Sequence, residues 1–77
     1  MRAIFVRVTN EDSPSYAPVL ATPITSTTFS IEGAHPNFAD VALEFGVGDS
    51  VRCKVSRLRG PGESEARQRM IAVERIG

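Results

Sequence analysis

The chain has 77 residues, a hydrophobic share of 42%, and nine Lys and Arg against nine Asp and Glu. This length leaves room for one small domain, so residues 1–77 are expected to share a single core. The balanced charge excludes the uniformly basic proteins whose total charge alone predicts nucleic-acid binding. No apolar run approaches the roughly 18 to 20 residues of a membrane-spanning helix, so no membrane partner is expected.

The chain has one cysteine, Cys53, and one histidine, His35. An intramolecular disulfide is therefore excluded, and these two residues do not have the paired spacing of zinc ligands. We expect no metal and no cofactor. Because such a small domain has a thin margin of stability, it needs either an efficient closed core or association with a second copy.

The N-terminal segment Ala3–Val8 is rich in β-branched and aromatic residues and is predicted to be a strand. Apolar residues fall on both of its faces, which predicts a strand that is covered on both sides. Arg7 interrupts the apolar run, and no export or lipidation signal is visible. Together with the lone thiol, this predicts a cytoplasmic protein.

A turn is predicted at Thr9–Ser15, followed by the proline-containing stretch Tyr16–Thr25. Each proline removes a backbone donor, so this stretch is predicted to be irregular or an edge strand, with Val19–Ala21 as the edge. The alternation in Ser26–Glu32 predicts another strand. A loop is predicted at Gly33–Asn37.

The cleanest alternation in the chain predicts a half-buried strand at Asp40–Val47. Its apolar positions are Val41, Leu43, Phe45 and Val47. A helix over Phe38–Phe45 is the alternative, because Ala, Leu and Glu are good helix formers. The spacing of two between the apolar positions favours the strand.

Two more strands are predicted at Ser50–Leu58 and Gln68–Ile76, joined by the long loop Arg59–Arg67. Leu58 falls on the polar phase of its strand, which predicts a bulge near Ser56–Arg57. The run Gly48–Val55, a turn followed by a basic alternating strand, is similar to one in many small barrels, S1-type RNA-binding OB domains among them.

The expected fold class is all-β, because five or six short strands are predicted and no long helix. A flat sheet of this size exposes its edges and half-covers its faces, and closure removes both problems. We therefore predict a small five- or six-stranded barrel, closed or partly open, that is SH3-like or OB-like. In such a barrel Cys53 shares its strand phase with Val51 and Val55, which predicts a buried, unreactive thiol.

The zero net charge hides a division along the chain. Residues 1–49 carry two arginines against six carboxylates, whereas residues 50–77 carry seven Lys and Arg against three carboxylates. Guanidinium groups donate paired hydrogen bonds to phosphate oxygens, so a hairpin of the last two strands is predicted to bind nucleic acid. The candidate cations are Arg52, Lys54, Arg57, Arg59, Arg67 and Arg69. Tyr16 and Phe38 are loop aromatics that can stack on a base.

Other interpretations of these residues stay open. Charges on an exposed strand also block edge-to-edge aggregation, and Tyr16 and Phe38 are equally suited to capping an open barrel end. The alternative function is a protein–protein or self-assembly module, in which the oppositely charged halves or a sheet edge meet a partner protein or a second copy, giving a homo-oligomer. An enzyme is not expected, because a single histidine and turn glycines without a phosphate-loop lysine form no catalytic constellation.

Overall fold

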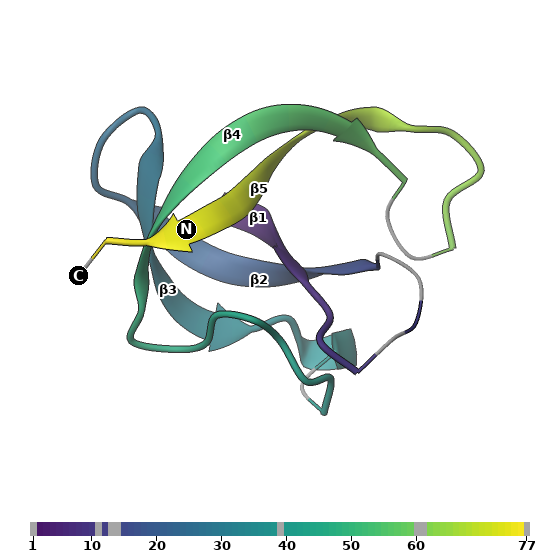
Figure 1. Cartoon of the computed structure of the whole chain (residues 1–77), viewed down its shortest axis with the longest axis horizontal. Helices are drawn as coiled ribbons and strands as arrows, with labels where there is room; N and C mark the ends of the chain where they lie inside the picture. The colour runs from purple at the N-terminus through teal and green to yellow at the C-terminus, as the bar shows by residue number, and fades with distance from the viewer. Residues whose placement is uncertain (1, 11, 13–14, 39, 60–61, 77) are drawn as a thin grey trace.

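Five strands form a closed barrel in the computed structural model, which describes residues 2–10, 12, 15–38, 40–59 and 62–76 (Figure 1). The elements are β1 (Arg2–Arg7), β2 (Tyr16–Pro23), β3 (Thr28–Ala34), the 3-10 turn η1 (Pro36–Phe38), β4 (Ser50–Leu58) and β5 (Arg67–Arg75). The predicted small all-β barrel is confirmed. No helix in the described part of the chain is long and apolar enough to cross a membrane.

Each strand pairs with the next along the chain, so the sheet is a meander. An OB-fold instead contains a Greek-key connection, which the described strands do not show. The ring is closed by β1 and β5, which run parallel and meet at a single register pair, Phe5 with Ile71. This narrow seam is the place where the barrel is least continuous.

The interior of the barrel is apolar. Alternate residues of the strands point inward, as the period of two predicts, and Phe29 is the largest side chain that is fully buried. The inner cluster contains Ile4, Val6, Val19, Ala21, Phe29, Ile31, Phe45, Val51, Cys53 and Ala72. No polar or charged side chain of the described residues is buried, so burial of apolar surface is the main stabilising contribution.

The proline-containing stretch is a strand with neighbours on both sides, not an irregular or edge segment. β2 pairs with β1 over Tyr16–Ala21 and with β3 over Val19–Pro23. The prediction failed because Pro18 and Pro23 both lie outside Val19–Ala21, the part that has two neighbours. At each proline one side of the strand is open, so a missing N–H need not interrupt a central ladder.

The predicted strand at Asp40–Val47 is wrong. The described residues of this segment form turns and bends, with one bridge between Leu43 and Val8, and the alternative helix is limited to η1. Its neighbours β3 and β4 pair directly with each other, so no ladder is left for it. The apolar alternation instead places Phe45 in the inner cluster and packs Leu43 against it.

β4 has the predicted bounds, and β5 begins one residue before the predicted start. The register between them shifts at Arg52 and Cys53, which face Glu74 and Ala72, so the extra residue is Val73. The bulge is therefore not near Ser56–Arg57 as predicted. Because a bulge increases strand twist, it helps β5 to pass from its hairpin with β4 to its seam with β1.

The turn predicted at Thr9–Ser15 and the loop predicted at Arg59–Arg67 are described only in part. Residues 11, 13, 14, 60 and 61 lie outside the described residues. No strand includes residues 9–10, 59 or 62–66, which agrees with the predictions, whereas Arg67 at the end of the predicted loop is the first residue of β5.

Candidate nucleic-acid interface

The β4–β5 hairpin extends past the barrel wall (Figure 1). β4 pairs with β3 only over Ser50–Arg52, but with β5 as far as Leu58. Over residues 54–58, β4 therefore has β5 on one side and no described strand on the other. Val55, which shares its strand phase with the buried Val51 and Cys53, is therefore 60% exposed.

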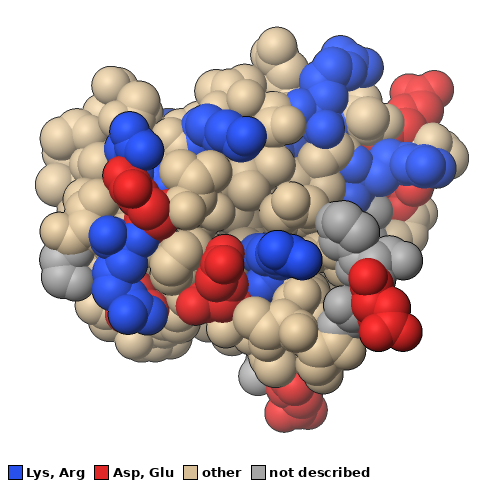
Figure 2. All heavy atoms as spheres, in the orientation of Figure 1, with Lys and Arg blue, Asp and Glu red and all other residues tan. Residues whose placement is uncertain are grey.

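The register distributes the predicted cations over both faces of the hairpin. Lys54, Ser56 and Leu58 lie on one face of β4, because side chains alternate along a strand. Arg67 lies opposite Leu58 in the register, so Arg67 and Lys54 share this face. Arg57 lies on the opposite face. Figure 2 shows Lys and Arg gathered on the side of the molecule that β4 and β5 occupy, with Asp and Glu between and below them. The cations thus surround the hairpin rather than form one row.

Two of the six predicted cations are held by carboxylates. Arg52 Nε lies 2.7 Å from Glu74 Oε1, its cross-strand neighbour. Arg69 forms an ion pair with Glu63 of the loop between β4 and β5. A phosphate would have to compete with these carboxylates, so Arg52 and Arg69 are less accessible to a ligand than the sequence alone suggests.

The other four predicted cations, Lys54, Arg57, Arg59 and Arg67, are exposed. The ion pairs found among the described residues involve none of them. Arg57 donates a hydrogen bond of 3.3 Å to the backbone carbonyl of Ala66, across the base of the loop. These four side chains are therefore the ones that a phosphate can reach without displacing a carboxylate of the described chain.

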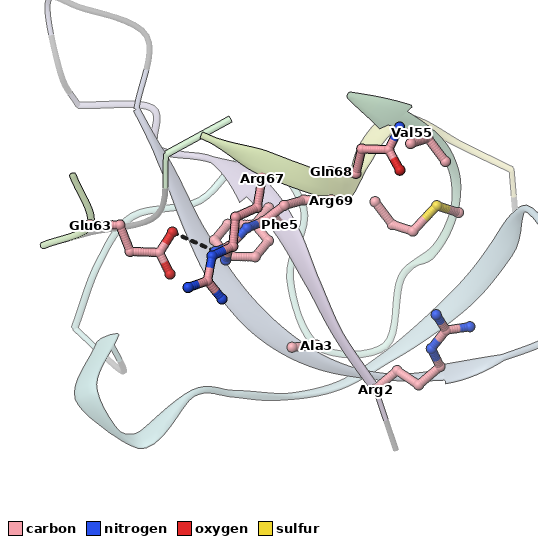
Figure 3. Close-up of a pocket in the computed structure, with 9 residues that line it drawn as sticks. Arg2, Ala3, Phe5, Val55, Glu63, Arg67, Gln68 and Arg69 are labelled. Carbon is pink, nitrogen blue, oxygen red and sulfur yellow. Dashed lines mark hydrogen bonds and ion pairs between the residues drawn. The ribbon is translucent and has the colours of Figure 1, made fainter. Parts of the chain in front are cut away.

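A groove of about 640 Å³ opens beside the seam between β1 and β5 (Figure 3). Its guanidinium groups belong to Arg2, Arg67 and Arg69. Its apolar side chains are Ala3, Phe5, Val55 and Met70. The groove therefore combines positive charge with an apolar surface, and these are complementary to the negative phosphate and to the face of the base of a nucleotide.

Arg69 covers an aromatic ring on the outer face of β1. Its guanidinium carbon lies 4.7 Å from the centroid of the Phe5 ring, and only 16% of its side chain is exposed. Phe5, although it points away from the inner cluster, is 6% exposed. The cation–π contact and the apolar stem of Arg69 thus supply the cover on the second face that the sequence predicts for β1.

Neither of the predicted aromatic residues lines this groove. Tyr16 lines a separate hollow of about 250 Å³ together with Lys54 and Arg7. Phe38 lies in η1, where its ring centroid is 5.7 Å from that of His35. Tyr16 is therefore placed near one predicted cation, and Phe38 is placed with a loop histidine.

Arg2, Phe5 and Glu63 line the groove but are not among the residues predicted from the sequence. The apolar outer face of β1 was the available signal for Phe5, because an outward phenylalanine needs a cover. No local pattern connects Arg2 with Arg67, since the topology alone brings the first and last strands together. Among the described residues no group of three His, Cys, Asp or Glu is placed to hold a metal ion.

Arg75 is a third arginine that pairs with a carboxylate, and it stabilises the turn before β4. The backbone N–H of Gly46 donates to Asp49 Oδ2 at 2.9 Å, and Arg75 Nη2 lies 3.3 Å from the same oxygen. The hydrogen bond from Gly46 and the charge of Arg75 lower the pKa of Asp49. Arg75 therefore has a structural role at the barrel end and is not a candidate for the interface.

Cys53 is buried, and desolvation raises the pKa of its thiol from 9.0 to about 11. Above the ordinary pKa the unfolded chain releases this proton while the folded protein keeps it, so stability is retained below pH 9 and lost as the pH rises toward 11. We expect this thiol to lower the free energy of unfolding by about 2 kcal/mol between about pH 8 and about pH 10.5.

Urea denaturation at those two pH values measures this loss, with Cys53→Ala as the comparison. The alanine variant retains every other titrating group, so its alkaline loss of stability should be smaller by that amount. An identical pH dependence in the two proteins would show that the thiol is not desolvated.

Comparisons with protein-family models, with curated proteins and with solved structures find no match.

Proposed function

We propose that this protein is a non-catalytic, cytoplasmic β-barrel module that binds nucleic acid through its β4–β5 hairpin and the adjoining groove. The observation that supports the proposal is the groove beside the barrel seam. It places the guanidinium groups of Arg2, Arg67 and Arg69 around apolar side chains, at the base of a hairpin with further exposed cations.

Each part of this surface suits one part of a nucleotide. Exposed arginines donate two parallel hydrogen bonds to phosphate oxygens, and Arg57, Arg59 and Arg67 have no carboxylate to release first among the described residues. The apolar wall at Val55 and Met70 accepts the face of a base. Binding neutralises phosphates and releases counterions, so affinity should fall steeply with salt.

An NMR titration with short single-stranded and duplex oligonucleotides tests the proposal at about 50 and about 200 mM salt. We expect amide shifts in residues 54–58 and 67–70 and at the start of β1, all weaker at the higher salt. Residues 22–28, between β2 and β3, should not shift and serve as the internal control. Unchanged hairpin amides at low salt would exclude this binding surface.

A second candidate function is a protein–protein or self-assembly module, favoured by the open edge of β4. Residues 54–58 present backbone groups to which another strand can add, and Val55 exposes apolar surface beside them. Lys54 and Arg57 on the same strand oppose such pairing by charge. Sedimentation tests the self-assembly form of this function, because a mass that rises with protein concentration supports it and a constant monomer mass excludes it.

A further inference from the structure

The ion pair between Glu63 and Arg69 lies inside the groove (Figure 3, dashed line). Glu63 comes from the loop that joins β4 and β5, and its side chain is 33% exposed, against 16% for Arg69. Among the described residues that line the groove, Glu63 is the one carboxylate, and the guanidinium it holds is the one stacked on Phe5. The most enclosed cation of the groove is therefore already occupied by an acidic group of the chain itself.

We infer that the groove is a phosphate site for single-stranded nucleic acid, and that the Glu63 carboxylate occupies the place of a backbone phosphate on Arg69. This inference rests on the proposed function. Carboxylate and phosphate oxygens accept hydrogen bonds from the same guanidinium donors with similar geometry. Either group can hold Arg69 against Phe5, and the two compete for it.

The apolar surface beside Arg69 specifies a single strand rather than a duplex. Val55 and Met70 lie in the same groove as the guanidinium, so a ligand that fills it must offer apolar surface next to a phosphate. A single strand offers unpaired base faces next to its phosphates, whereas a duplex stacks its bases inside and presents mainly phosphates. Arg2 and Arg67 in the same groove are placed to contact neighbouring phosphates of such a strand.

Each bound strand must displace the Glu63 carboxylate from Arg69, and this displacement costs binding free energy. Removal of the charge of Glu63 should therefore tighten binding. Glu63→Gln keeps the length and shape of the side chain but removes the carboxylate. We expect this variant to bind a fluorescein-labelled oligothymidylate of about ten nucleotides about five- to tenfold more tightly than the natural sequence at low salt. Fluorescence anisotropy gives the dissociation constants.

Glu65→Gln is the matched control, because it makes the same change of net charge two residues away in the same loop. Glu65 is exposed, does not line the groove and forms none of the ion pairs found among the described residues. Its affinity should stay within about twofold of the natural sequence, because an exposed carboxylate outside the groove competes with no bound phosphate and acts only through electrostatics that the solvent screens. A tenfold gain for Glu63→Gln alone therefore reports the groove and not the total charge.

The outcomes separate this inference from the proposed function. Equal tightening by both variants, or none by either, would overturn the role of Glu63 while leaving nucleic-acid binding in place. A duplex bound by Glu63→Gln as tightly as the single strand, or inorganic phosphate bound as tightly as the oligonucleotide, would overturn the assignment of the ligand. If neither the natural sequence nor Glu63→Gln binds any oligonucleotide, the inference and the proposed function both fail.

Discussion

Replacement of Phe29 by alanine is expected to unfold most of the protein at room temperature. Phe29 is 0% exposed and is the largest fully buried side chain of the barrel. It lies in the middle of three strands, opposite Pro23 of β2 and Val51 of β4. Truncation of a buried phenylalanine costs about 3 to 5 kcal/mol, and a single core of this size supplies about the same amount of net stability.

Circular dichroism and urea denaturation measure this effect. The variant should show no cooperative unfolding transition at 25 °C, or a midpoint close to zero urea. Ile24→Ala is the control, because it also removes apolar atoms but at a side chain that is 55% exposed, so its stability should change by less than about 0.5 kcal/mol. A Phe29→Ala protein with a nearly normal midpoint would show that the interior is not packed around this ring.

Removal of Arg57, Arg59 and Arg67, which form none of the ion pairs found among the described residues, should abolish most nucleic-acid binding without loss of the fold. The triple variant Arg57→Ala, Arg59→Ala, Arg67→Ala is expected to bind a single-stranded oligonucleotide about a hundredfold more weakly at low salt, if each exposed phosphate contact contributes about 1 kcal/mol. The slope of log affinity against log salt should become shallower by about two, because fewer counterions are released.

A control with the same change of net charge uses three exposed polar residues outside the hairpin, Asn10, Ser26 and Asn37, each replaced by Glu. This protein should bind within a few-fold of the natural sequence and keep its salt slope. Equal weakening in both triple variants would mean that binding depends on the overall charge and not on the hairpin. Urea midpoints for both variants establish that the fold is retained.

The strands of this barrel could be predicted where alternation and pairing agree. Ser50–Leu58 has a period of two and also has partners, so the predicted and observed bounds coincide. Asp40–Val47 has an equally clear period but no free ladder beside it, because β3 and β4 pair directly. Alternation reports which side chains face the core, and Phe45 does face it, but strand formation also requires a partner that is distant in the sequence.

The candidate interface was predictable in its charge and not in its contacts. The excess of Lys and Arg after residue 50 is visible in the sequence, and the register of the hairpin distributes these cations over both of its faces. The pairing of Arg69 with Glu63 and of Arg52 with Glu74 depends on loop path and register, which composition does not contain. The contribution of Arg2 and Phe5 to the groove depends on closure of the barrel, which brings β1 and β5 together.

Because β1 and β5 share a single register pair, these two strands can separate while the four antiparallel pairings of the barrel stay intact. Such local opening would first expose Ile71 and Phe5 to solvent, and it would require less free energy than global unfolding. A ligand bound in the groove between Arg2 and Arg67 contacts both β1 and β5. Its binding would therefore stabilise the closed barrel and slow amide hydrogen exchange along β1.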